Sequence, residues 1–510
     1  MENEIKSETK PVPKFSLWRT VNVGLAFFTI CIFWQVYNSV MPLFLKDYYL
    51  NKMQTGLVMA LGNFVGLFML PLIGGLSDRL PKQWRFLGKR VPFIVIGSVL
   101  AAIAFLLINY AHNAVAGNGA DGSLWVMLLF VLLTVTSMAL YRTPAVSLMP
   151  DVTLKQHRSK GNAIINLIGG IGGVIGMGLM MFLVKSEYRP YTGAGLPPQA
   201  EIDAGKWVLL KSNEWVEALK AGKNVFPQKF IGGGNWPLFV VVSALMILAA
   251  VMLVVLVNEN KLVEQKQRQL KELGIDEDRN AEGKKADAGV TGSPFRNLTR
   301  PERKSLTFLL ISVAMWYFAY TALTTHFSDF CWVRLQEDNF ALPMIIAQGA
   351  AFLSFYPAAL LGQKLGRKKT IQIGVLMFIA GSGVGSVLML PFVGATALKV
   401  CMYLVFFLIG AGWAMINVHS FVMSVEFAGK ENNGFFTGLY YVACNAANIL
   451  TPILAGVFMD INYSLLMPYS LVFIVLALVS MMFVKHGNEK KGGYLSEKPK
   501  TKSGQAEKTV

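Results

Sequence analysis

The sequence predicts an all-α membrane protein whose twelve transmembrane helices form two six-helix bundles. Three observations carry this prediction. The chain of 510 residues is 54% hydrophobic and only 15% charged, whereas soluble domains carry about 25% charged residues. Twelve segments are apolar over about 20 residues, the length that crosses the hydrocarbon core of a bilayer. The net charge of +17 is concentrated between those segments, which indicates membrane topology and argues against a nucleic-acid-binding face.

The expected spanning segments alternate with short polar turns. The apolar stretch from Thr20 to Leu45 is too long for a signal-peptide core, so we expect a retained first helix. The twelve expected cores are residues 20–42, 54–76, 91–111, 123–141, 161–184, 236–257, 305–326, 341–362, 370–391, 397–422, 434–458 and 464–484.

The distribution of Lys and Arg predicts the orientation. With the N-terminus inside, the inner segments carry 36 basic residues and the outer segments carry 11. Most of the outer charges lie in the long loop 185–235, where the positive-inside rule is weak. We therefore expect a multi-pass protein of the cell (inner) membrane, surrounded by lipid, with both termini in the cytoplasm.

The chain divides into two halves joined by a charged linker. Within the outer loop, Glu201–Lys220 is expected to form a short amphipathic helix. The linker begins with a helix-favouring run and becomes rich in Gly, Ala and Asp, as linkers do. The expected units are a cytoplasmic segment (1–19), an N-terminal bundle (20–257), the linker (258–304), a C-terminal bundle (305–484) and a cytoplasmic tail (485–510).

Related basic turns follow the second and the eighth predicted helix. Glycines there let helices approach closely, and a carboxylate such as Asp78 can meet a helix N-terminus. Basic side chains in the same turns can bind carbonyl and acidic groups across the two halves. The alternative is ordinary positive-inside charge. The predicted inner gate comprises Gly74, Asp78, Arg79, Gly88, Arg90, Asp151, Arg158, Gly366 and Arg367.

These turns resemble those of a known family. Gly74-Gly75-Leu76-Ser77-Asp78-Arg79 followed by Gly88-Lys89-Arg90 resembles the signature loop of the major facilitator superfamily. Pro144-Ala145, Arg158-Ser159-Lys160-Gly161, Ser328-Asp329-Phe330 and Gly438-Leu439-Tyr440 resemble elements of its sucrose/proton symporter branch (glycoside-pentoside-hexuronide-like) and the bacterial relatives of that branch.

The resemblance implies alternating access between two halves, with a sugar bound near the midplane and moved by proton symport. One position departs from the branch. Plant members carry an acidic residue, associated with proton binding, where this chain has Val135. The second-half turn also has Gln363 where the superfamily pattern has Asp. These departures leave open an uncoupled transporter.

Several ionisable side chains lie in or beside the apolar segments. A charge at depth costs about 2.5–3.5 kcal/mol on insertion scales, so we predict that Arg142 lines a cavity or gate. The alternative is a side chain that reaches the inner headgroups. His326 and Asp329 share one helix face at the outer end of the seventh segment. We predict that this pair couples proton entry; the alternative is a water-exposed helix end.

His419 and Glu426 lie on one face near the inner end of the tenth segment. They are candidates for a proton path or for part of the inner gate. The alternative, which we favour for the histidine, is a structural group whose hydrogen bonds are satisfied within the protein.

Aromatic and amide side chains mark the candidate substrate site. Sugars present apolar faces and many hydroxyls, so their sites combine rings with amide or charged groups. Amides are expensive in lipid unless they are bonded, although each could instead join two helices. The candidates are Trp34, Gln35, Asn38, Arg142, Asn166, Trp316, Tyr320, Gln348, Trp413, Asn417 and Asn445, with Tyr440 and Tyr441 near the last of them.

The sequence predicts a secondary active transporter for a disaccharide or glycoside, driven by proton symport. The alternatives are an uncoupled facilitator or exporter of another small polar solute, and a non-transporting membrane sensor. A sensor predicts a large soluble domain, for which the linker and tail are too short. No nucleophile–base pair or metal cluster points to an enzyme. We expect no cofactor beyond a proton or cation gradient, no nucleic-acid partner, and a monomer.

Overall fold

The computed structural model describes most of the apolar part of the chain. The described residues are 15–47, 52–80, 86–115, 121–183, 187–188, 207–210, 224–227, 229–230, 235–272, 294–295, 298–330, 341–390, 395–428 and 432–486. Within them, twelve helices are long and apolar enough to cross a membrane. The predicted all-α membrane fold is confirmed.

The first half of the chain supplies six spanning helices and one further helix. The spanning helices are α1 (Leu17–Asp47), α2 (Lys52–Asp78), α3 (Val91–Val115), α4 (Asp121–Val152), α5 (Arg158–Leu183) and α8 (Trp236–Leu256). A short 3-10 turn, Lys155–His157, precedes α5, and the charged helix α9 (Glu259–Glu272) follows α8.

The second half of the chain supplies the other six spanning helices. They are α11 (Arg300–Phe330), α12 (Ala341–Leu365), α13 (Arg367–Leu388), α14 (Ala395–Val425), α15 (Asn433–Ile461) and α16 (Leu466–Met482). A 3-10 turn, Tyr463–Leu465, separates α15 from α16.

Helix α4 is longer than its hydropathy predicts. The expected core ends at residue 141, but α4 continues to Val152 through Pro144 and Pro150. Prolines are tolerated in membrane helices where neighbouring helices satisfy the polar groups around them. Here the hydroxyl of Thr143 donates to the carbonyl of Leu70 on α2 (3.1 Å). The extension places Asp151 in the last helical turn rather than in a loop.

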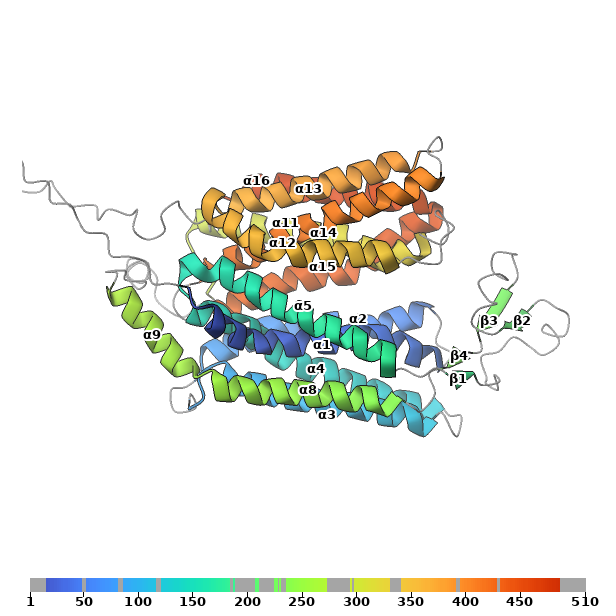
Figure 1. Ribbon diagram of the computed structural model, residues 1–510, viewed down its shortest axis with the longest axis horizontal. Coiled ribbons are helices and arrows are strands. Elements are labelled where there is room, and N and C mark those ends of the chain that lie inside the picture. Colours follow the sequence, from blue (N-terminus) through green and yellow to red (C-terminus); the bar gives the residue numbers. More distant parts are fainter. Residues whose placement is uncertain are drawn as a thin grey trace, which may run out of the picture.

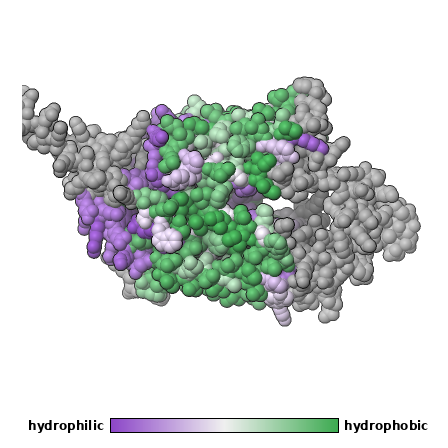
Figure 2. Space-filling view, in the orientation of Figure 1, coloured by the Kyte–Doolittle hydropathy of each residue, from purple (hydrophilic) through white to green (hydrophobic). Residues whose placement is uncertain are grey.

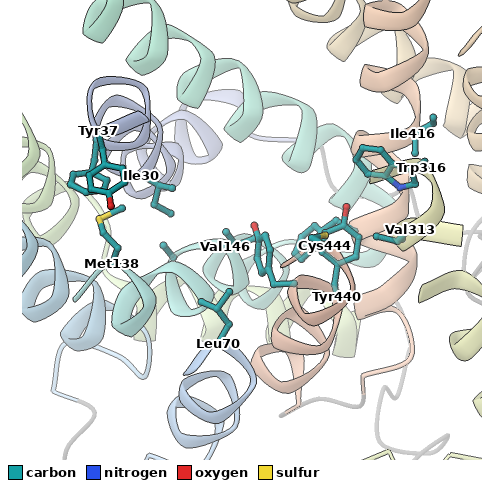
Figure 3. Close-up of a cluster of buried hydrophobic side chains, with 14 of the residues drawn as sticks. Ile30, Tyr37, Leu70, Met138, Val146, Val313, Trp316, Ile416, Tyr440 and Cys444 are labelled. Atoms are coloured by element: carbon teal, nitrogen blue, oxygen red, sulfur yellow. The ribbon is translucent and has the colours of Figure 1, made fainter. Parts of the chain in front are cut away.

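The helices form two bundles that meet along a limited set of contacts. Helices α1–α8 form one bundle and α11–α16 form the other (Figure 1). Between the bundles, α2 packs against α15, and α5 packs against α12 and α14. Buried apolar side chains continue across this interface: Figure 3 shows Leu70 and Val146 beside Tyr440 and Cys444 of α15.

The outer surface of the helices is apolar, as a lipid-facing surface must be. Phe68 on α2 is 71% exposed and Leu353 on α12 is 73% exposed. Hydrophobic residues cover the helical body, and hydrophilic residues gather at the end that carries α9 (Figure 2). We call this the inner end, because the predicted excess of Lys and Arg lies there.

Short strands, rather than a helix, occupy the described parts of the long loop. β1 (Glu187–Tyr188) pairs antiparallel with β4 (Lys229–Phe230), and β2 (Trp207–Leu210) pairs in parallel with β3 (Asn224–Pro227). The predicted amphipathic helix is therefore wrong at Trp207–Leu210. Trp, Val and Leu in sequence fit a strand when a partner supplies the backbone hydrogen bonds.

Candidate functional site

Glycines bring α2 and α15 into backbone contact at the inner end. A Cβ atom on Gly74 would collide with the carbonyl of Gly434, and one on Gly434 would collide with the carbonyl of Gly74. Gly438 is in similarly close contact with Pro71. Because no side chain separates these backbones, polar groups at the ends of the two helices can meet across the bundles.

A buried cluster centred on Arg90 joins three helices at this point. Its guanidinium donates from Nε to Asp151 Oδ2 (2.7 Å) and also bonds Asp78 and the hydroxyl of Ser77. Lys89 Nζ lies 3.6 Å from Asp151 and 3.9 Å from Asp78. Burial alone lowers the pKa of Arg90, but Asp151 and Asp78 raise it above its ordinary value. The guanidinium is therefore a permanent cation between two carboxylates.

The Arg90 cluster, which we define as Asp78, Lys89, Arg90, Asp151 and Asn433, crosses from one bundle to the other. Asn433 at the start of α15 donates from Nδ2 to Asp151 Oδ1 (2.7 Å). Asp78 accepts from the backbone N–H groups of the next two residues of α15, at 3.1 and 2.8 Å. A carboxylate at a helix N-terminus is stabilised by the free N–H groups and the helix dipole. Part of the predicted gate is therefore assembled here.

A second cluster, centred on Arg367 at the start of α13, makes the corresponding connection from the other bundle. Arg367 Nη1 lies 3.1 Å from Glu426 Oε1, and Arg158 on α5 lies 3.3 Å from the same oxygen. The Arg367 guanidinium also donates to Ser159 Oγ (3.1 Å) and to the carbonyl of Lys155 (2.7 Å). One carboxylate thus holds two arginines from different bundles.

His419 completes this second group, the Arg367 cluster (Arg158, Ser159, Arg367, His419 and Glu426). It is fully buried, with Nδ1 3.1 Å from Ser159 Oγ and Nε2 2.9 Å from the carbonyl of Ala358. Both ring nitrogens have partners, so the geometry fits a structural histidine. Nearby, Asn162 Nδ2 donates to the carbonyls of Asn417 and Val418 (3.2 and 2.9 Å).

The two clusters occupy matching positions in the two halves of the chain. Gly88 has a φ of 110° and Gly366 a φ of 89°, a region that favours glycine. Each glycine is followed by basic residues, one of which, Arg90 or Arg367, is almost completely buried. Arg79 differs: it is exposed beyond the end of α2, and the structure does not bring it into either cluster.

Helix α9 fastens the linker to the Arg90 cluster, which the sequence did not predict. Glu259 accepts from the backbone N–H groups of Lys89, Arg90 and Val91 at 3.0, 2.9 and 3.1 Å. About two turns further along α9, Lys266 Nζ donates to the carbonyls of Pro150 and Asp151, both at 3.3 Å. An acidic residue directly after a spanning helix is the local signal for Glu259, but its partners are about 170 residues away in sequence.

The three backbone bonds of Glu259 lead to a stability prediction with a defined pH dependence. Burial is the largest influence and raises the pKa of the Glu259 carboxyl above its ordinary value, although the N–H of Arg90 opposes this. Since the pKa is higher in the folded than in the unfolded protein, the stabilisation from this group falls as pH rises through the folded pKa. The non-ionising variant Glu259→Gln should therefore gain stability relative to the wild type as pH rises.

Thermal unfolding of the purified protein from pH 5 to pH 8 measures this effect. Glu259→Ala leaves three N–H groups without their acceptor and should cost about 1–3 kcal/mol. The matched control is Glu264→Gln, an exposed carboxyl on the same helix, which should follow the wild-type profile. Parallel profiles for the wild type and Glu259→Gln would contradict the prediction.

Arg142 lies between aromatic rings of both bundles, deep in α4. Its Cζ atom is 4.6 Å from the ring centroid of Tyr441 on α15 and 6.0 Å from that of Trp34 on α1. Trp34 is itself in edge contact with Phe33 at 5.4 Å. The structure therefore places Arg142 at the interface between the bundles, and its role in lining a cavity or gate stays a prediction.

A second aromatic group faces the interface from the other bundle. Tyr320 on α11 stacks on Trp413 of α14 at 5.4 Å, and Gln348 Nε2 lies 3.5 Å from the Tyr320 hydroxyl. Trp316, one turn before Tyr320, is 1% exposed and lies near Ile416 in Figure 3. Asn445, also 1% exposed, lies against Gly66 of the first bundle.

Not all of the sequence candidates join these groups. Asn166 donates to Asn162 on its own helix at 2.8 Å, and Asn417 contributes a backbone carbonyl to the inner contact. Gln35 lies near the α5 glycines and Asn38 is exposed. His326 is half-buried near the outer end of α11. Asp329 closes the same helix, but its side chain lies outside the described residues, so its role stays a prediction.

The architecture defines a multi-pass membrane transporter, in which two helical bundles meet at ion-paired inner ends and share an aromatic centre. The chain belongs to the Major Facilitator Superfamily, whose family model matches residues 2–177 and 229–452. The resemblance found in the sequence motifs is thereby confirmed at the level of the superfamily.

Among curated proteins, the chain resembles the sucrose transport protein SUT2 of rice, in both Oryza sativa subsp. indica and subsp. japonica. Identity is 26% over 194 residues, which make up 36% of this chain and 38% of each rice protein. The match thus spans less than two fifths of the length of these relatives.

Solved structures extend the similarity of fold to nearly the whole chain. The proton:xylose symporter XylE superposes with a TM-score of 0.63 at 13% identity, over 92% of this chain and 95% of that one. The E. coli fucose:proton symporter FucP gives 0.59 at 12% identity, over 92% and 98%. A bacterial homologue of the iron transporter ferroportin, in its outward-facing state, gives 0.62 at 12% identity, over 92% and 99%.

Proposed function

We propose that this transporter moves a sugar across the cell membrane by alternating access, coupled to proton symport. The observation that carries the proposal is the centre of the bundle interface. Stacked rings such as Tyr320 and Trp413 lie beside amide groups, the combination that recognises sugar rings and hydroxyls. The rice relative is described as a sucrose transport protein, which favours a disaccharide or related glycoside.

The arrangement of contacts also fits alternating access. Both ion-paired clusters close the inner end, and a rocking motion of the bundles would have to break them. In this proposal both termini are cytoplasmic, the bundles are residues 20–257 and 305–484, and the clusters stabilise the state that is open to the outside. Binding of solute and proton would then release the inner end.

A second candidate is a facilitator or exporter without proton coupling. It is favoured by Val135, a buried apolar residue of α4 at the position where plant sucrose/proton symporters carry a carboxyl. Similarity of fold does not decide between the two, because a likeness at 12–13% identity extends to sugar symporters and to an iron transporter homologue alike.

Uptake of radiolabelled sucrose and maltose into proteoliposomes, with and without an inward proton gradient, tests both candidates. Symport predicts accumulation above equilibrium that requires the gradient. Asp329→Asn should abolish the accumulation, and Asp47→Asn, a carboxyl at the outer end of α1, serves as the matched control. Equilibration that ignores the gradient would favour the facilitator, and no sugar-dependent signal would refute the sugar assignment.

A further inference from the structure

Several hydrogen-bond donors at the centre of the bundle interface have no acceptor among the described residues. Trp316 and Asn445 are each 1% exposed, so water outside the protein does not reach them freely. Buried donors are normally paired, and an unpaired one is a candidate for ligand contact. The atoms concerned are Trp34 Nε1, Arg142 Nε, Trp316 Nε1, Trp413 Nε1 and Asn445 Nδ2.

Arg142 adds a positive charge to this donor-rich surface. Asp151 on the same helix is nine residues further on, about 14 Å along the axis, and is engaged by Arg90. Tyr441 and Trp34 approach the guanidinium with their rings. The Tyr441 hydroxyl also shares a hydrogen bond with the guanidinium, and ring faces stabilise a cation in part. The Nε atom, however, has no acceptor among the described residues.

The fully buried arginines at the inner end of the bundle interface have carboxylate partners. Arg90 bonds two carboxylates, and Arg158 and Arg367 share Glu426. A cation inside a membrane protein is expected to face a counter-charge, a carbonyl or a cavity. Arg142 has no carboxylate among its described contacts, so a ligand that brings a negative charge would complete its coordination.

We propose that the transported sugar carries an anionic group, a carboxylate or a phosphate, which binds Arg142. Either group accepts two parallel hydrogen bonds from a guanidinium, and the indole and amide donors supply further contacts to its oxygens. The aromatic pair of Tyr320 and Trp413 stacks on the sugar ring. This inference rests on the proposed function, since it names the class of sugar bound at the same site.

Tryptophan fluorescence titration of the purified, full-length protein provides the test. The probes are maltose, maltose oxidised to a carboxylate at its 6′ carbon, and maltose 6′-phosphate, with acetate and inorganic phosphate as anions without a sugar. We expect one of the charged sugars to bind at least about tenfold more tightly than maltose, the gain expected of a charge-assisted bond. The charged sugar that binds more tightly identifies the anionic group as a carboxylate or a phosphate.

Variants connect the preference to Arg142. Arg142→Gln should reduce the ratio of charged to neutral affinity to about one, while Arg142→Lys, which keeps the charge, should retain a preference. Arg79→Gln, an exposed arginine on the inner side, is the matched control and should leave the ratio unchanged. Monodisperse elution in size-exclusion chromatography establishes that each variant is folded. If Arg142→Gln does not fold, Arg142→Lys still tests whether the charge at this position sets the preference.

The outcomes separate the two proposals. Maltose binding as tightly as both charged sugars, or a preference that survives Arg142→Gln, would overturn the anionic assignment and leave sugar transport standing. If acetate or phosphate binds as tightly as the charged sugars, the sugar ring contributes nothing to binding. That result would refute the assignment of a sugar substrate and with it the proposed function. Absence of binding by every probe would overturn both.

Discussion

Arg90→Met is expected to destabilise the protein by about 3–5 kcal/mol, the largest loss that we expect of a single substitution in either inner cluster. The substitution preserves much of the buried volume but removes the cation that holds Asp78 and Asp151. Both carboxylates have side chains that are 3% exposed. Only Lys89 would then remain as a cation beside the two buried carboxylates. The orientation of Asp78 and Asp151 toward the first turn of α15 would no longer be fixed by Arg90.

Thermal unfolding of the purified protein measures the loss. The matched control is Arg79→Met. It removes the same charge from the same inner turn, but Arg79 is exposed and lies outside the Arg90 cluster. We expect it to change stability by less than about 0.5 kcal/mol. Equal losses for the two variants would mean that Arg90 acts only as part of the inner positive charge.

Glu426→Gln is expected to have the second-largest effect, on the conformational equilibrium rather than on folding. Glu426 is the shared partner of Arg158 and Arg367, and neutralising it leaves two guanidiniums facing each other across the bundles. Hydrogen bonds to charged groups contribute about 1.5–3 kcal/mol. A change of about 1.4 kcal/mol shifts a two-state population about tenfold, so the inner end should open at least about tenfold more often.

Labelling of Cys444 by a membrane-impermeant maleimide, added at the inner side, reports the opening. Cys444 is buried on α15, and the other cysteines are replaced by Ser. We expect faster labelling in Glu426→Gln and slower uptake, with Glu264→Gln on the exposed face of α9 as control. Unchanged labelling would show that the Arg367 cluster does not hold the inner end closed.

The stability of the Arg367 cluster should depend on pH in one direction. Burial by itself raises the pKa of the Glu426 carboxyl, but Arg367, Arg158 and Lys155 bring it below its ordinary value. A depressed pKa gives stabilisation that persists at neutral pH and is lost as pH falls through the folded pKa. Because maleimide reacts with the thiolate, the labelling rate itself falls with pH, and the comparison is the ratio of the rates of Glu426→Gln and the wild type at each pH. This ratio should be constant near neutrality and approach one only under strong acidification, where Glu426 of the wild type is neutral as well.

The sequence motifs identified the residues of the two inner clusters only in part. Asp78, Arg90, Asp151, Arg158 and Arg367 were all predicted there, and the structure brings each of them into one of the two clusters. Arg79 was predicted with them on the same grounds. The partners that complete the clusters, such as Asn433 and Glu259, lie far away in sequence and carry no local pattern that assigns them.

The sequence by itself determined the class of protein and its twelve spanning helices. A run of about 20 apolar residues is a local property, and lipid leaves a helix as the simplest way to satisfy its backbone. The signal for the paired turns after the second and eighth helices is local as well, because a glycine followed by basic residues can be recognised within a few positions.

Only the tertiary structure decided which of the similar basic residues have structural partners. Arg79 and Arg90 are indistinguishable as charges in one turn, yet one is exposed and the other has no exposed surface. The difference arises because the turn at Gly88 and the last turn of α4 bring Arg90 to Asp151, 61 residues away. Electrostatic partnership depends on distance in space, and the packing of helices sets that distance.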